Sequence, residues 1–147
     1  MATKDLVHRV EYFTLTVEDK PGQASTIQKG LARENVQLLG MLAFPAEKGR
    51  TQVDLVPEHP EDLRKAAKKL ALELRGPKTA FLVHGQDRVG ALSEIFQRLG
   101  DERIGIRATL GVTCGANRFG ALLWVAPSDV EATSRMLGAT VLATHHV

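Results

Sequence analysis

Several classes of structure are excluded by what this sequence contains only in small amounts. Its 147 residues include one cysteine, Cys114, so no disulfide can form within the chain, and we expect a reducing, cytoplasmic location. No apolar run approaches the length that spans a bilayer, and residues 1–5 lack the apolar stretch of a secretion signal. The 19 basic and 17 acidic residues leave a net charge of +2, which is weak evidence for a nucleic-acid partner.

The sequence also lacks the usual arrangements of catalytic and metal-binding residues. Cys114 has no neighbouring His or Asp, and neither a glycine-rich phosphate loop nor a serine nucleophile elbow is present. The histidines show no helical metal-ligand spacing, although His84 precedes a loop and could touch a ligand there. We therefore expect a protein that is not an enzyme and that needs no metal or cofactor. The histidines are His8, His59, His84, His145 and His146.

The main positive feature of the sequence is an internal repeat. Asp19-Lys20-Pro21-Gly22-Gln23 follows a strand-like run, and Asp87-Arg88-Val89-Gly90-Ala91 follows another, at an offset of 68 residues. Apolar residues recur at the same offset, as in Phe13 and Phe81. A repeat of this kind indicates a duplicated structural unit.

Hydrophobic periodicity predicts the same order of elements in both repeats. In the first repeat, residues 10–17 alternate like a half-buried strand and residues 22–34 carry one apolar stripe like a helix. We predict an α+β fold with two ferredoxin-like βαββαβ units in tandem, each an antiparallel sheet with its helices on one face. Gly76-Pro77 is the expected linker, which gives units at 8–76 and 77–147. A fourth strand is expected at 140–143 in the second unit and stays undecided in the first.

One predicted strand, residues 36–44, is apolar on both faces. A strand with one face open to water alternates between apolar and polar residues instead. We therefore expect the second face to be covered by the other repeat or by a second subunit, and we expect a homodimer. Leu39, Gly40 and Met41 lie in the middle of this strand.

These features resemble the ACT domain, a small regulatory module that binds amino acids and related effectors. Asp19-Lys20-Pro21-Gly22 matches the Asp-x-Pro-Gly motif that this family carries between its first strand and first helix. Asp87-Arg88-Val89-Gly90 matches it more loosely, because Val89 replaces the proline. The resemblance covers residues 10–144 and implies a free-standing tandem ACT protein.

The resemblance also implies where an effector binds. In ACT domains the effector lies between the first loop and a strand of a neighbouring domain. The loop amides would meet its carboxylate, Asp19 would orient the loop or meet the ammonium group, and the 36–44 strand of the facing unit would line the pocket. The implied contacts are Asp19, Pro21, Gly22, Gln23, Ala24, Leu39, Gly40 and Met41, with Asp87, Gly90 and Ala91 in the second repeat.

Simpler interpretations of the same residues stay open. Asp19 and Asp87 also suit helix N-caps, and Gly22 also suits close packing of a helix on a sheet. The function predicted first is a non-catalytic regulatory protein that binds a small amino acid at an interface between domains or subunits. The alternatives are an effector-free subunit that docks on a metabolic enzyme, and RNA binding through the open sheet face, for which Phe119 and Trp124 are the candidate stacking residues.

Overall fold

The computed structural model describes residues 5–142, which form two compact units. Within these residues, the first unit holds residues 11–78, and the second unit holds residues 79–142 together with residues 5–10. The N-terminal residues therefore belong to the unit that contains the second sequence repeat. The predicted α+β fold with two tandem ferredoxin-like units and antiparallel sheets is confirmed.

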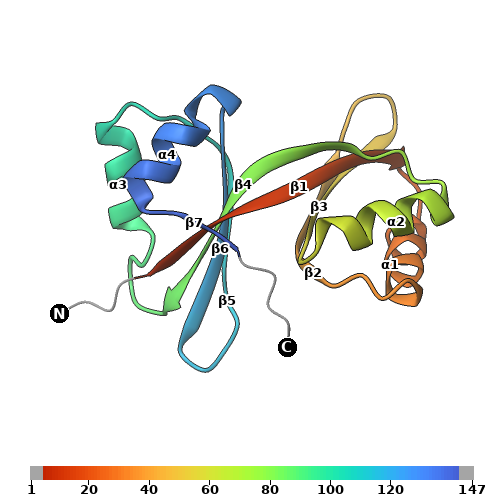
Figure 1. Ribbon diagram of the computed structural model, residues 1–147, viewed down its shortest axis with the longest axis horizontal. Helices are drawn as coiled ribbons and strands as arrows, with labels where there is room; N and C mark the ends of the chain where they lie inside the picture. Colours follow the sequence, from red (N-terminus) through yellow and green to blue (C-terminus); the bar gives the residue numbers. More distant parts are fainter. Residues whose placement is uncertain (1–4, 143–147) are drawn as a thin grey trace. The chain divides into compact units, whose positions relative to one another are not determined.

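The first unit places two helices against four strands (Figure 1). Its strand order is β2-β3-β1-β4, and Phe13 of β1 pairs with Leu55 of β3 in antiparallel register. Residues 75–78, the start of β4, fill the fourth position that the sequence left undecided. The elements are β1 (Leu6–Glu18), α1 (Gln23–Arg33), β2 (Leu38–Pro45), β3 (Arg50–Pro57), α2 (Pro60–Leu70) and β4 (Arg75–Gln86).

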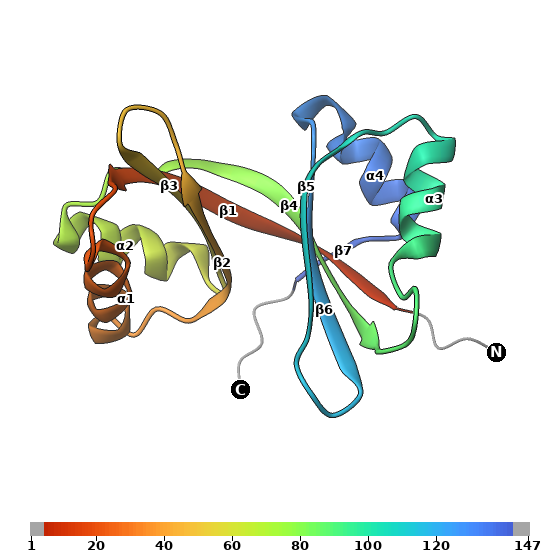
Figure 2. The same cartoon turned by 180° about the vertical axis from the view of Figure 1, so that it is seen from behind.

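The second unit has the order β7-β1-β4-β6-β5 and carries α3 and α4 (Figure 2). Residues 6–10 of β1 lie next to β4, in the position that a ferredoxin-like unit gives to its fourth strand. The predicted last strand exists, but it pairs in parallel with β1, where His8 faces Thr140. The elements are α3 (Ser93–Asp101), β5 (Ile106–Thr113), β6 (Arg118–Val125), the 3₁₀ helix η1 (Pro127–Asp129), α4 (Val130–Leu137) and β7 (Thr140–Val141).

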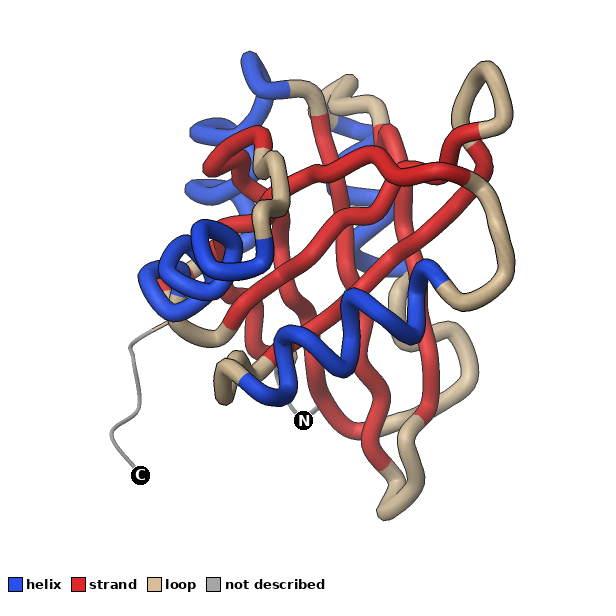
Figure 3. The backbone as a smooth tube through the Cα atoms, turned by 90° about the vertical axis from the view of Figure 1, so that its right-hand side faces the viewer, coloured by secondary structure: helices blue, strands red, loops and turns tan. Residues whose placement is uncertain are grey.

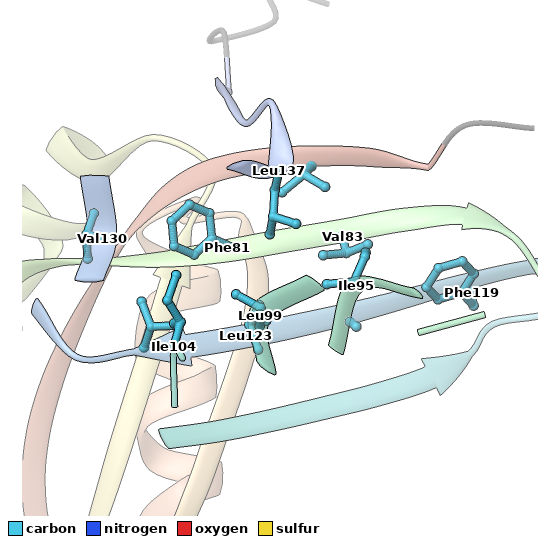
Figure 4. Packing of buried hydrophobic residues seen from close by; sticks show 12 residues of the cluster. Phe81, Val83, Ile95, Leu99, Ile104, Phe119, Leu123, Val130 and Leu137 are labelled. Carbon is cyan, nitrogen blue, oxygen red and sulfur yellow. The ribbon is translucent and has the colours of Figure 1, made fainter. Parts of the chain in front are cut away.

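Each unit has its own hydrophobic core. In the second unit, alternate residues of β4 and β6 meet the apolar stripe of α3, as Phe81, Leu123 and Leu99 show in Figure 4. In the first unit, Phe13 and Leu31 occupy the equivalent places. Burying a side chain of this size contributes about 1.5–3 kcal/mol, so these stripes fix which face of each sheet the helices cover.

The duplication extends to the backbone. Gly22 and Gly90 have positive φ angles of 93° and 72°, and Asn35 and Arg103 have φ angles of 56° and 59° after their helices. The pairing register shifts between Leu38 and Gly40 in β2, and again at the matching place in β5. The alternation of strands, helices and loops can be followed in Figure 3. None of the helices in residues 5–142 is long and apolar enough to cross a membrane.

Candidate functional site

The loops after β1 and β4 each form the same kind of turn. In the first loop the Asp19 amide donates to Gly49 O at 2.9 Å, and the Gln23 amide donates to Lys20 O at 3.3 Å. In the second loop the amides of Asp87 and Ala91 make the matching bonds, to Asn117 O at 2.7 Å and to Arg88 O at 3.2 Å. The turn therefore survives the replacement of proline by Val89.

The loops differ in where the helix begins. In the first unit α1 starts at Gln23, directly after Gly22, and the Thr26 amide closes the first helical turn on Gly22 O at 2.9 Å. In the second unit α3 starts only at Ser93, whose amide reaches back three residues to Gly90 O at 2.9 Å. The second loop is therefore longer, because residues 91–92 stay outside the helix.

This longer loop lines a hollow of about 270 Å³, which we call the second-loop pocket. Asp87 supplies a carboxylate, Thr113 supplies a hydroxyl, and the other side chains are apolar. Gly111 is close enough to the loop that a Cβ there would lie 3.2 Å from Leu92 Cδ1. The lining residues are Asp87, Ala91, Leu92, Gly111, Val112, Thr113 and Phe119.

A second hollow, of about 380 Å³, lies in the first unit between α1 and β2. The Gln28 amide donates to Met41 Sδ at 2.6 Å, and the Gln37 amide donates to Leu38 O at 3.1 Å. We call it the α1–β2 hollow. It is lined by Gln28, Val36, Gln37, Leu38, Leu39, Gly40 and Met41.

The predicted site residues are thus divided among three places. Asp87 and Ala91 line the second-loop pocket, with Gly90 in the same loop, while Leu39, Gly40 and Met41 line the α1–β2 hollow. The first-loop residues line neither hollow; they are Asp19, Pro21, Gly22, Gln23 and Ala24. Sequence reasoning missed Leu92, Val112, Thr113 and Phe119. Gly111 carried a usable signal, because an isolated glycine inside a strand pattern indicates close approach of another group.

The N-cap interpretation of the two aspartates is wrong. The residue that caps α1 is Gly22 and the one that caps α3 is Leu92, and neither cap has a side-chain hydrogen bond. Asp19 lies four residues before Gln23, the first residue of α1, which is too early to cap the helix. Asp87 lies at the pocket instead of at the start of α3.

Arg88 crosses the second loop and holds it to the N-terminal residues. Its Nη1 and Nη2 donate to the two carboxylate oxygens of Asp5 at 3.0 and 2.9 Å. The guanidinium also donates to Gln86 O at 2.9 Å and to Ala91 O at 3.3 Å. Its Cζ lies 5.9 Å from the centre of the Phe119 ring. The hydrogen bond with Asp5 raises the pKa of Arg88, and the nearby acidic groups Asp5, Glu94 and Asp87 add to this effect.

His84 lies in a hydrogen-bonded chain outside the pocket. The Arg118 guanidinium can only donate, so His84 Nδ1 accepts its hydrogen bond at 3.0 Å. The neutral His84 ring then carries its proton on Nε2, which donates to His8 Nε2 at 3.1 Å. His8 Nδ1 in turn lies 3.2 Å from Thr140 Oγ1. Among residues 5–142 no three His, Cys, Asp or Glu side chains form a metal-binding group, and His145 and His146 lie outside this range.

The aromatic residues that motivated RNA binding are not available for stacking. Phe119 is 4% exposed and belongs to the core of the second unit, and Trp124 is 6% exposed. Bases stack on aromatic rings that present a face to solvent. The burial of Phe119 and Trp124 therefore takes the support of these two rings away from that alternative.

Comparison with known structures identifies the fold. Protein BT0572 from Bacteroides thetaiotaomicron has a TM-score of 0.72 and 18% identity over 92% of this chain and 90% of that chain. The ligand-free regulatory subunit of aspartate kinase from Thermus thermophilus has a TM-score of 0.61 and 15% identity, over 92% of this chain and 95% of that chain. This chain has the tandem ACT fold. No protein-family model matches its sequence, and no curated protein matches it.

The tandem ACT fold also relates the chain to the aspartokinase alpha and beta subunits, with a TM-score of 0.57 and 20% identity over 93% of this chain and 96% of that chain. At these identities the likeness concerns the fold, and the resemblance stated from the sequence is confirmed at that level. In the tandem ACT fold of this chain, the second-loop pocket lies at the loop where the family resemblance implies an effector.

Proposed function

We propose that this protein is a non-catalytic regulatory protein that binds a small amino acid in the second-loop pocket. The observation that carries the proposal is the position of that pocket, at the Asp87 to Leu92 loop of an ACT fold. Its volume of about 270 Å³ is just below the range of pockets for drug-sized ligands, which suits a ligand of a few heavy atoms.

The pocket offers complementary partners for an amino acid. The Asp87 carboxylate can pair with an ammonium group, and such charged hydrogen bonds are about twice as strong as neutral ones. The amide of Leu92, which lines the pocket at the start of α3, has no backbone acceptor within the described residues, so it is proposed to donate to the carboxylate. Ala91, Val112 and Phe119 leave an apolar wall for a small side chain.

A second copy of the chain is proposed to complete the site. β5 is an edge strand of the second unit, and its Leu110 and Val112 are 44% and 60% exposed. Edge strands with exposed apolar residues tend to pair with another chain. Val112 belongs both to this edge and to the pocket, so pairing there would bring a partner to the bound effector. The regulated target is proposed to be a metabolic enzyme.

A thermal-shift screen with the twenty amino acids at millimolar concentration tests the proposal. Binding to the native state raises the melting temperature by mass action, so at least one amino acid should give a dose-dependent shift. No shift with any of them, on a folded sample, would contradict amino-acid binding and favour the effector-free docking subunit.

Variants then locate the site of any amino acid that binds. Gly111→Val fills the pocket, because even a Cβ at this position lies 3.2 Å from Leu92, and should abolish the shift. Gly105→Val is the matched control, because a Cβ there meets nothing within 4 Å. Asp87→Asn should weaken binding about tenfold or more, whereas Asp19→Asn should leave it unchanged. Binding that is lost with Asp19→Asn and kept with Gly111→Val would move the site to the first loop.

A further inference from the structure

The second loop lacks a covalent restraint that the first loop has. In the first loop Pro21 fixes its own φ angle covalently. Val89 at the matching position supplies no such restraint, and its side chain is fully exposed. The two loops nevertheless make the same turn, so another interaction must limit the conformations of the second loop.

We infer that Arg88 and Asp5 form a clasp that takes the place of the missing proline and positions the second loop for ligand binding. This inference rests on the proposed function for its ligand, but the ordering of the loop can be measured without one. Asp5 belongs to the N-terminal residues of the second unit, so the pocket is expected to depend on residues distant in sequence.

The geometry of Arg88 supports the clasp. Its guanidinium accounts for four hydrogen bonds, two to Asp5, one to Gln86 O before the loop and one to Ala91 O within it. It therefore joins both ends of the loop while its charge is paired. The Asp5 side chain is 11% exposed and the Arg88 side chain is 38% exposed, so the carboxylate side of the pair is the one shielded from water.

The equivalent pair in the first loop has none of these features. The repeat places Lys20 where the second loop has Arg88. Lys20 pairs with Glu18 at 3.2 Å, and both side chains are more than 60% exposed. A lysine cannot make the planar, two-pronged contact that Arg88 makes with a carboxylate. The first loop thus has the proline without the clasp, and the second has the clasp without the proline.

Gly85 provides an independent indication that the position of Asp5 is specific. A Cβ at Gly85 would overlap Asp5 Oδ1 and would lie 2.9 Å from Asp5 Cγ. The first repeat has Val17 at the matching position, where no carboxylate needs room. The absence of a side chain at Gly85 lets the Asp5 carboxylate lie against β4 within reach of Arg88.

Hydrogen–deuterium exchange on the full chain, without ligand, tests the clasp. Asp5→Ala, Arg88→Ala and Gly85→Ala should each speed exchange in residues 88–93 by about tenfold, with the core of α3 unchanged. Lys20→Ala, the matched control, should leave exchange in residues 20–26 unchanged. Adding Val89→Pro to Asp5→Ala should restore protection, because a proline then supplies the restraint.

Two outcomes would overturn the inference. The first is unchanged exchange in residues 88–93 when Asp5 or Arg88 is replaced. The second is faster exchange throughout the second unit, which Val89→Pro does not restore, because this would mean that the pair only stabilises the fold.

The amino-acid screen adds a second measurement that separates this inference from the proposed function. Any amino acid that shifts the wild-type melting temperature should bind Asp5→Ala at least several-fold more weakly and Lys20→Ala equally well. Equal binding by Asp5→Ala would overturn the link between clasp and pocket. If no amino acid binds the wild type, the proposed function fails, and the exchange comparison still decides whether the clasp orders the loop.

Discussion

At the scale of single residues, backbone conformation explains where glycine is required. Gly22 has a φ angle of 93°, a region that costs a residue with a side chain about 1–2 kcal/mol. A Cβ at Gly22 would meet nothing within 4 Å, so any effect of substitution comes from the backbone alone. Gly100, near the end of α3, has equal space around it and no positive φ.

These two glycines give a matched pair of predictions. Gly22→Ala should lower the free energy of unfolding by about 1 kcal/mol, because alanine is strained at positive φ. Gly100→Ala should raise it by up to about 0.5 kcal/mol, because alanine restricts the unfolded chain and favours helix. Urea unfolding measures both, and a loss of stability with Gly100→Ala would contradict the helical conformation at that residue.

α4 also makes a contact whose strength depends on pH, through the charge of Glu131. The Glu131 carboxylate accepts two hydrogen bonds from Arg9, at 3.1 and 2.9 Å, which lower the pKa of Glu131. A carboxyl group with a lowered pKa in the folded state stabilises the fold above its unfolded pKa. This contribution is lost as the pH falls through its folded pKa.

Glu131→Gln should therefore lower the melting temperature slightly at pH 7 and by less at pH 3, because the charge of the wild-type carboxyl group is lost as the pH falls through its lowered pKa. Melting curves of both proteins between these pH values test the prediction, and the difference should shrink steadily towards the acid end. A constant difference across the range would mean that Glu131 acts through packing and not through its charge.

At the scale of elements, the edge strands β2 and β5 differ in what they expose. In β2, Leu38 to Leu42 are half-buried and Phe44 is 39% exposed. In β5 all residues after Ala108 are exposed, including Leu110 and Val112. The apolar edge of β5 is therefore the stronger candidate for contact with a second chain.

We expect Val112→Lys to shift a dimer to the monomer, because a buried unpaired ammonium group is costly at an interface. Analytical ultracentrifugation measures this, and the monomer should still melt cooperatively, at a temperature that no longer depends on protein concentration. Val141→Lys, at a residue of β7 that is 77% exposed, is the control and should leave the dimer intact. A wild-type protein that is monomeric at every concentration would contradict the proposed homodimer.

Sequence patterns predicted the positions of the helices and strands better than they predicted which strands pair with one another. Core residues that recur in both repeats, such as Phe13 and Phe81, allowed the strands and helices to be predicted, because these elements follow the local periodicity of apolar residues. The position of residues 6–10 beside β4 depends on pairing between distant strands, which alternation alone does not specify. Of the residues that line the second-loop pocket, Asp87 and Ala91 belong to the repeated motif, whereas Leu92 precedes α3, which begins at Ser93.

At the scale of the whole molecule, the second unit is made from two separate stretches of the chain, residues 5–10 and residues 79–142. Residues 6–10 bring Val7 and Val10 into the second unit, where they are 8% and 6% exposed. They also bring His8 and Arg9, which bond to His84 and Glu131. Without these residues β4 would have a bare edge in the second unit.

A fragment of residues 77–147 should therefore not fold cooperatively by itself. Adding a synthetic peptide of residues 5–12 should restore a cooperative melting transition, which circular dichroism can follow. A peptide with Val7→Asp and Val10→Asp is the control and should have no effect, because charges are costly where those valines are buried. A fragment that melts cooperatively without any peptide would contradict this view of the second unit.

The shared strand has a consequence for how the protein is made. Residues 6–10 leave the ribosome before the β4 residues that pair with them in the second unit, which are translated only after the whole first repeat. During that interval residues 6–10 lack their β4 partner, and an unpaired apolar strand invites pairing with the wrong chain. We therefore expect newly synthesised chains to need protection until β4 has emerged, and slow translation of the first repeat to lower the yield of native protein.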